Sequence, residues 1–148
     1  CQMMREVMDE SQMIHPNRRW RLRLAEERLP VQGDAALLKQ AARVLVDNAV
    51  RYTADGDSIT LIARQKENDP CFEVQDNGMG IKPEDLNHIF DRFYRSDPAR
   101  ARTTGGTGLG LSIAKWIVER HGGYFDVFSR EDFGTRMSVI LPQQAEEQ

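Results

Sequence analysis

Apolar side chains recur at helical spacing in three parts of the chain. Residues 1–14 carry such a pattern and end at a proline turn, and residues 35–52 are rich in helix formers without glycine or proline. Asp34 supplies an N-cap for the second segment. Residues 108–121 stop at a glycine pair, which is a helix C-cap signal. The predicted apolar stripe of the second helix consists of Leu38, Ala41, Leu45, Ala49 and Tyr52.

Strict alternation predicts strands elsewhere. In residues 19–24, Trp20, Leu22 and Leu24 share one face while three arginines share the other, which indicates a half-buried strand. Strands and helices segregate instead of alternating as βαβ units, so we expect an α+β fold, a two-layer sandwich with a mixed sheet. The other predicted strands are residues 58–64, 71–76, 124–129 and 135–141.

A long segment without regular pattern separates these elements. Residues 77–107 show only a short helix at residues 83–90, and a polar turn is expected at residues 66–70. Structureless segments of this length in a compact domain are commonly lids or binding loops.

Composition narrows the class of protein. The 148 residues contain 20 Lys and Arg against 23 Asp and Glu, a net charge of -3, which argues against nucleic-acid binding by bulk charge. Residues 1–148 lack a long apolar run and an opening signal peptide, and Cys1 and Cys71 form no ligand spacing. We expect a single cytoplasmic domain without direct membrane contact, cut from a longer protein because the first residues resemble the middle of a helix.

The glycine-rich run at residues 105–110 leads directly into a predicted helix. Backbone N–H groups at a helix start suit a polyphosphate. A Walker A loop and a Rossmann fingerprint are both excluded, because Leu111 occupies the position of the required lysine or third glycine. The structural alternative for this run alone is a flexible linker.

A second candidate site follows the strand that ends at Asp76. Asp76 shares a face with Phe72 and Val74, so its carboxylate is expected to be part-buried and to need a donor, such as the exocyclic amino group of a base. Gly78 and Gly80 allow a sharp turn and let a flat ligand lie against backbone. The alternative is a plain Asn-Gly turn.

Asn48, Arg51 and Tyr52 lie on adjacent turns of one predicted helix face. The Asn48 side-chain oxygen suits Mg²⁺, and Arg51 suits a phosphate. The alternative is a solvated asparagine beside an ordinary surface ion pair between Asp47 and Arg51.

Arginines gather between the two glycine-rich segments. Beside the aromatic residues Phe90, Phe93 and Tyr94, the stretch 91–104 is basic within an acidic protein, which suits a lid over a triphosphate. The alternative is a solvated charged loop. The arginines are Arg92, Arg95, Arg100 and Arg102, against Asp91 and Asp97.

Taken in order, these segments closely resemble the N, G1, F and G2 boxes of bacterial sensor histidine kinases. The resemblance spans residues 33–142 and implies the catalytic and ATP-binding domain of the GHKL superfamily, an α/β sandwich with a mostly antiparallel sheet and a flexible ATP lid. It implies a leading helix (1–16), a lid (91–107), a polar tail (143–148) and no phosphoacceptor domain. The resembling segments are residues 45–53, 76–81, 89–95 and 105–113, with 117–123 and 134–135.

The resemblance also implies roles for individual residues. It makes Asn48 the Mg²⁺ ligand, Arg51 a phosphate contact where lysine is common, and Asp76 the acceptor of the adenine amino group. It places Tyr52 near the nucleotide, and Arg92 or Arg95 at the γ-phosphate once the lid closes. The implied base pocket includes Gly78, Gly80 and Ile81, and the implied phosphate loop includes Gly106, Thr107, Gly108, Leu109 and Gly110.

The implied activity is transfer of the γ-phosphate of Mg-ATP to a histidine of the parent's dimerisation domain and then to a response-regulator aspartate. Val44 stands where relatives often carry a polar residue, and valine cannot polarise water, so weak isolated hydrolysis is expected. His15, His88 and His121 do not fit the phosphoacceptor context. The fragment is expected to be monomeric and its parent dimeric. The alternatives are an ATP-gated conformational switch or ATPase, and a non-catalytic partner-binding remnant.

Overall fold

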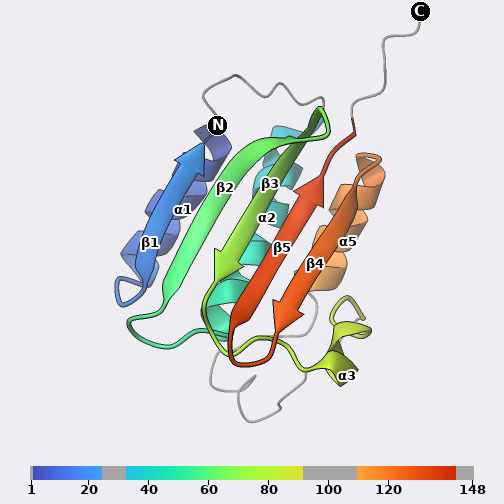
Figure 1. Cartoon of the computed structure of the whole chain (residues 1–148). Helices are drawn as coiled ribbons and strands as arrows, with labels where there is room; N and C mark the ends of the chain where they lie inside the picture. The colour runs from blue at the N-terminus through green and yellow to red at the C-terminus, as the bar shows by residue number, and fades with distance from the viewer. Residues whose placement is uncertain (1, 25–32, 92–109, 143–148) are drawn as a thin grey trace, which may run out of the picture.

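The computed structural model describes residues 2–24, 33–91 and 110–142. They form a five-stranded sheet with the longer helices packed on one of its faces (Figure 1). This is the two-layer α+β architecture that the pattern predicts, and the prediction is confirmed. In chain order the elements are α1 (Gln2–Ile14), β1 (Arg19–Leu24), α2 (Ala35–Arg51), β2 (Ser58–Lys66), β3 (Asp69–Asp76), α3 (Pro83–Leu86), α5 (Gly110–Arg120), β4 (Tyr124–Arg130) and β5 (Gly134–Ile140).

The sheet is mixed and mostly antiparallel. Its order is β1-β2-β3-β5-β4, and only the β1–β2 pair is parallel among the pairs of the described strands. A parallel pair needs a crossover connection, and helix α2 lies in that connection. The two faces differ because successive side chains of a strand point in opposite directions.

The face of the sheet turned toward the helices forms the core. Residues paired across β2, β3 and β5, such as Leu61, Val74 and Met137, are nearly inaccessible to solvent. Every member of the apolar stripe predicted for α2 is buried against this face. Burial of such apolar surface is the main source of stability, at roughly 25 cal/mol per Å².

Helix α2 is held at both of its ends. The Asp34 side chain accepts a hydrogen bond from the Leu37 amide at 3.1 Å, which is the predicted N-cap. The Asp34 amide in turn donates to His121 Nε2 at 3.0 Å, which links the start of α2 to the end of α5. Tyr52 is the C-cap and donates its amide to the Asn48 carbonyl at 3.2 Å.

The structure differs from the sequence pattern in several bounds. The hairpin β2–β3 is longer than predicted, because Glu67 and Asn68 turn within two residues at φ 52° and 75°. The short helix α3 ends at Leu86, and turns continue to residue 90. At the end of α1 Ile14 is 70% exposed, because the helix stops where its face leaves the core.

No helix within the described ranges is both long enough and apolar enough to cross a membrane.

Candidate functional site

Asp76 ends β3 on the face of the sheet that is turned toward the helices. It pairs with Thr135 of β5, and its Oδ1 accepts a hydrogen bond from the Gly78 amide at 2.9 Å. Burial raises the pKa of the Asp76 carboxyl to about 6, although the backbone amides of Gly78 and Thr135 act to lower it. The site therefore holds a carboxylate that is short of donors when no ligand is bound.

Asn48 approaches the same face from helix α2. It is buried, and its Nδ2 donates to Met137 Sδ at 3.8 Å. Met137 lies two residues along β5 from Thr135, the partner of Asp76 in the sheet. Asn48 and Asp76 therefore both lie on the side of the sheet that faces α2, near neighbouring positions of β5.

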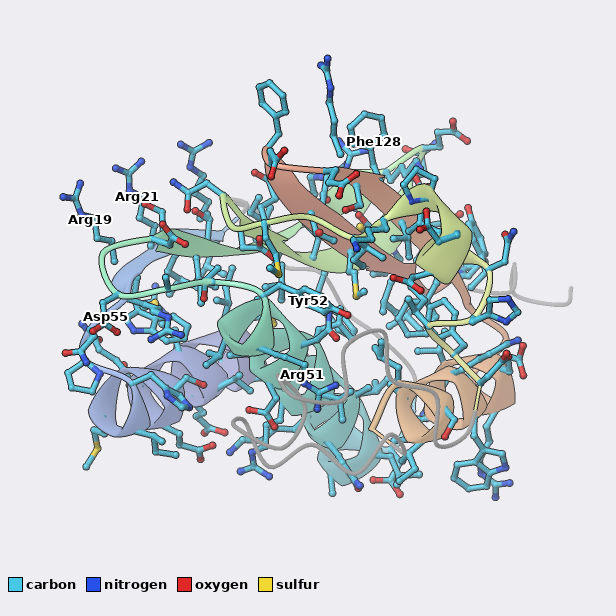
Figure 2. The ribbon with its side chains drawn as sticks, turned by 90° about the horizontal axis from the view of Figure 1, so that it is seen from below. Arg19, Arg21, Arg51, Tyr52, Asp55 and Phe128 are labelled. Atoms are coloured by element: carbon cyan, nitrogen blue, oxygen red, sulfur yellow. The ribbon has the colours of Figure 1, made fainter. Side chains whose placement is uncertain are left out.

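Arg51 and Tyr52 follow at the end of α2. Figure 2 shows Tyr52 between the end of α2 and the sheet, and Arg51 on the side of α2 away from the sheet. Tyr52 is buried, and its backbone carbonyl accepts a hydrogen bond from the Met79 amide at 2.9 Å. The end of α2 and the segment after Asp76 thus hold each other in place.

The glycines of that segment make close approaches to protein backbone. A β-carbon at Gly78 would overlap the carbonyl oxygen of Tyr52, and one at Gly80 would overlap that of Arg130. Gly80 also has a φ of 73°, which a side chain disfavours. Ile81 is buried, and its amide donates to Ser129 Oγ at 2.8 Å. These contacts give both glycines a role in shaping the loop.

The sequence prediction missed two polar side chains beside Asp76. Ser129 of β4 and Thr135 of β5 are joined by a hydrogen bond of 2.8 Å between their hydroxyl groups. Thr135 is buried directly opposite Asp76 in the sheet. Thr135 belongs to a segment that resembles the kinases, so that resemblance is the signal from which its place at the site could have been inferred.

The start of helix α5 lies against α2. A β-carbon at Gly110 would lie 3.4 Å from Cγ1 of Val44, one helical turn before Asn48. The predicted phosphate-binding end of α5 and the predicted metal ligand on α2 are therefore neighbours. The remaining predicted contacts lie outside the described residues, namely Arg92, Arg95, Gly106, Thr107, Gly108 and Leu109.

The donor set favours a cation that keeps most of its own water. Within residues 2–24, 33–91 and 110–142, no group of three His, Cys, Asp or Glu side chains is arranged to hold a metal ion. Mg²⁺ is commonly bound by one or two protein oxygens together with substrate phosphates and water. A single amide oxygen at Asn48 fits that pattern.

All three histidines have local structural contacts. The His15 carbonyl accepts a hydrogen bond from Trp20 Nε1 at 2.8 Å, and His88 Nδ1 lies 3.0 Å from Asp91 Oδ2. His121 Nδ1 donates to the Ile117 carbonyl at 2.8 Å, since its Nε2 accepts from the Asp34 amide.

Comparison with known proteins gives a consistent result. Residues 33–145 match the model of the family described as histidine kinase-, DNA gyrase B- and HSP90-like ATPase. The chain is 44% identical over 110 residues to the sensor protein SrrB of Staphylococcus aureus (strain NCTC 8325 / PS 47). The aligned residues cover 74% of this chain and 19% of SrrB. The chain thus spans about a fifth of the length of the curated relatives it matches.

Solved structures share the fold over nearly the whole chain. The mycobacterial sensor histidine kinase MprB is 26% identical with a TM-score of 0.79, covering 95% of this chain and 92% of that chain. A catalytic domain of the histidine kinase ThkA is 28% identical with a TM-score of 0.79, covering 95% and 90%. The chain belongs to the histidine kinase-, DNA gyrase B- and HSP90-like ATPase family, as the ATPase domain of a bacterial sensor histidine kinase.

Proposed function

We propose that this domain binds Mg-ATP between α2, α5 and the sheet, and transfers the γ-phosphate to a histidine of its parent's dimerisation domain. The observation that carries the proposal is that Asp76 and Asn48 both lie between α2 and the sheet, where Asn48 contacts Met137 two residues along β5 from the strand partner of Asp76. The Asp76 carboxylate suits the amino group of a base, and the Asn48 amide oxygen suits a magnesium ion bound to phosphates.

Asp76 would select the base. Its carboxylate accepts a hydrogen bond from the Gly78 amide and retains capacity for a further donor. The exocyclic amino group of adenine supplies that donor, whereas the carbonyl of guanine at the same position would face the carboxylate unfavourably. Gly78, Gly80 and Ile81 shape the adjoining wall, with Tyr52 close by.

The phosphate end would be formed by the two helices. Asn48 would hold the magnesium ion, which neutralises charge on the phosphates when bound. Arg51, on the last turn of α2, would contact a phosphate. The start of α5 at Gly110 contributes a positive helix end. Arg92, Arg95 and the loop Gly106, Thr107, Gly108 and Leu109 are proposed to complete the phosphate site.

Water is a poor acceptor in this arrangement. Val44 lies one turn before Asn48 and near Gly110, where an apolar side chain can neither orient nor deprotonate water. We therefore propose that the acceptor is the histidine of the parent's dimerisation domain. A response-regulator aspartate then receives the phosphoryl group. In this proposal the domain works on the cytoplasmic side of a membrane-anchored dimer.

The test is phosphotransfer from γ-labelled ATP to a separately produced dimerisation domain of the parent. The expected product is an acid-labile, alkali-stable phosphoprotein. Asn48→Ala should abolish it, whereas Gln40→Ala, an exposed amide on the same helix, should not. Steady hydrolysis of ATP without labelling of the acceptor would contradict the kinase assignment and favour an ATP-gated switch.

A further inference from the structure

The face of the sheet turned away from the helices carries arginines and aromatic rings that the nucleotide site does not use. Figure 2 shows Arg19, Arg21 and Phe128 pointing away from the helix layer. Strand alternation places seven basic side chains on this open face, against the acidic Asp69, Glu73 and Asp126. The seven are Arg19, Arg21, Arg23, Arg64, Lys66, Arg130 and Arg136. The open face is thus cationic, although the whole chain has a net charge of -3.

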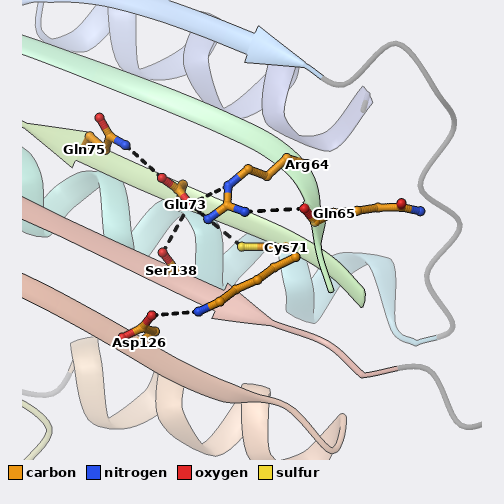
Figure 3. Close-up of polar contacts among 8 residues, drawn as sticks. Arg64, Gln65, Cys71, Glu73, Gln75, Asp126 and Ser138 are labelled. Atoms are coloured by element: carbon orange, nitrogen blue, oxygen red, sulfur yellow. Dashed lines mark hydrogen bonds and ion pairs between the residues drawn. The ribbon is translucent and has the colours of Figure 1, made fainter. Parts of the chain in front are cut away.

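Ion pairs neutralise the middle of the open face. Arg64 Nη2 lies 2.8 Å from Glu73 Oε1, and Lys66 Nζ lies 2.9 Å from Asp126 Oδ2 (Figure 3). Among the described residues, the other five arginines of this face form no ion pair. Positive charge therefore remains along β1 and at the end of the β4–β5 hairpin.

A cavity of about 340 Å³ opens at that end of the hairpin. Two arginines in its wall are stacked on exposed rings: Arg130 lies 4.5 Å from the Phe133 centroid, and Arg136 lies 5.6 Å from that of Phe128. Phe128 is 60% and Phe133 65% exposed, so this apolar surface has no cover within the described chain. Stacking holds each guanidinium in place with its N–H edge available.

Arg136 also has a side-chain donor without a hydrogen-bond partner among the described residues. Its Nε atom is buried, and no acceptor for it lies among the described residues. A buried donor without an acceptor is costly, and no hydrogen bond at Nε holds the Arg136 guanidinium in this position.

The sheet register aligns this cavity with the arginines of β1. One cross-strand row runs Arg21, Thr60, Gln75, Arg136 and Phe128. Its four strand spacings span roughly 19 Å, which about six residues of an extended chain cover. Arg21 stands at one end of the row and Arg136 beside Phe128 at the other, and the two residues between the arginines offer a hydroxyl and an amide as donors.

We propose that the open face binds an acidic, extended segment of a partner protein. The segment would place one apolar side chain in the cavity between Phe128 and Phe133 and its carboxylates on Arg136 and Arg21. Charge complementarity supports this occupant, since bidentate arginine–carboxylate pairs are strong. Most of the side chains of this site lie on the face of the sheet opposite Asn48, and the cavity borders Asp76 and Thr135 only where β3 and β5 meet at that end of the sheet. The proposal does not rest on the proposed nucleotide function.

Other anionic partners fit the surface less well. A nucleic acid needs an unbroken track of cations, whereas Glu73 and Asp126 interrupt the row next to Arg136, and the net charge repels a polyanion. A membrane surface needs apolar anchors spread over the contact, but the exposed rings Phe128 and Phe133 gather at one end.

The test is fluorescence anisotropy of a labelled ten-residue peptide of alternating glutamate and serine with one central leucine. Arg21→Glu should weaken binding about tenfold, as should Phe128→Ala, whereas Arg5→Glu, an exposed reversal on α1, should change it less than twofold. Replacing the central leucine by glycine should also weaken binding. Arg21 and Phe128 are exposed, so both variants are expected to fold, and a thermal melt of each checks this.

The competing ligands are measured in the same way, with an oligothymidine of ten nucleotides and vesicles containing 30% phosphatidylglycerol. Tighter binding of either one, lost in Arg21→Glu, would overturn the proposal. Peptide binding that does not distinguish Arg21→Glu from Arg5→Glu, or that ignores the central leucine, would overturn it as well.

Discussion

The Asp76 carboxyl group experiences opposing effects in the folded domain. Burial favours its protonated form and raises its pKa to about 6, while the Gly78 and Thr135 amides favour the ionised form. A ligand that donates a further hydrogen bond would add to the second effect. In the proposed function, Asp76 therefore links nucleotide binding to protonation.

One consequence is a pH dependence of stability without ligand. The pKa of Asp76 is about 6 when folded and about 3.9 when unfolded, so between these values the folded state binds more protons. The contribution of Asp76 to stability is therefore greatest below the unfolded pKa and falls as pH rises toward and through 6, by at most about 3 kcal/mol. Asp76→Asn should lose this decrease.

Urea unfolding at half-unit pH steps measures this effect as the difference between the wild type and Asp76→Asn. Asp9→Asn, an exposed change on α1, should retain the wild-type profile. A difference between wild type and Asp76→Asn that stays constant from pH 4 to 7 would contradict the assigned pKa.

Nucleotide affinity should follow the opposite course. Since the adenine amino group needs an ionised acceptor, affinity for ATP should decrease as pH falls below about 6. Asp76→Asn should weaken binding about 30-fold at pH 7.5, which is typical of a lost hydrogen bond to a charged group. Titration of a fluorescent ATP analogue measures both, and equal affinities at pH 5 and pH 7.5 would count against this role.

Among the elements, helix α2 and the loop after β3 hold each other through backbone contacts. The Met79 amide donates to the Tyr52 carbonyl, and Gly78 leaves no room for a β-carbon beside that carbonyl. Any displacement of the loop therefore also displaces the end of α2, which carries Asn48 and Arg51.

This coupling predicts an unequal effect of alanine at two glycines. Gly78→Ala should destabilise the domain by about 3 kcal/mol, because backbone must move. Gly122→Ala should cost about 1 kcal/mol, because Gly122 has a φ of 73° but open space around it. Chemical denaturation gives both values, and a larger loss at Gly122 would show that the Gly78 contact is unimportant.

A second element-scale prediction concerns the buried carboxylate of β3. Glu73 is 2% exposed and receives hydrogen bonds from Arg64, Gln75 and Ser138. Arg64→Leu should cost about 3 kcal/mol, because the carboxylate would remain without its main partner. Changing Glu73 to leucine as well should recover much of that loss. A double variant as unstable as the sum of the two single variants would contradict the pairing.

The elements themselves were largely predictable from the sequence. Alternation in β1 and the Asp34 cap of α2 are local signals, and both predictions are confirmed. The extent of the β2–β3 hairpin was not predictable from hydrophobicity, because its length depends on Glu67 and Asn68 adopting positive φ.

At the scale of the whole molecule, long-range pairing of strands brings together site residues that the sequence alone does not place side by side. Asp76 and Asn48 could be singled out as candidates from residue type and face, but Ser129 and Thr135 meet only because β4 pairs with β5 in one register. The order β1-β2-β3-β5-β4 likewise depends on long-range pairing that no local pattern contains.

The arrangement also separates two surfaces. The helix layer covers the face that carries Asp76, while the opposite face carries Arg21, Arg136 and Phe128. In the two proposals the nucleotide and the partner segment use different side chains, except at the end of β3, where the cavity of the open face borders Asp76.

The most direct test of the account is the thermal melting of the domain with and without Mg-ATP. At a hundredfold excess over Kd, the wild type should be stabilised by about 2.7 kcal/mol, which raises Tm by roughly 5 °C or more. Asp9→Asn and Gln40→Ala should show the same rise. At the same ATP concentration, Asp76→Asn should show about a third of it, since a roughly 30-fold weaker affinity leaves about 0.9 kcal/mol of stabilisation, and Asn48→Ala should show only the part that persists without magnesium. A full rise in Tm for Asp76→Asn would contradict the claim that Asp76 and Asn48 border one nucleotide pocket.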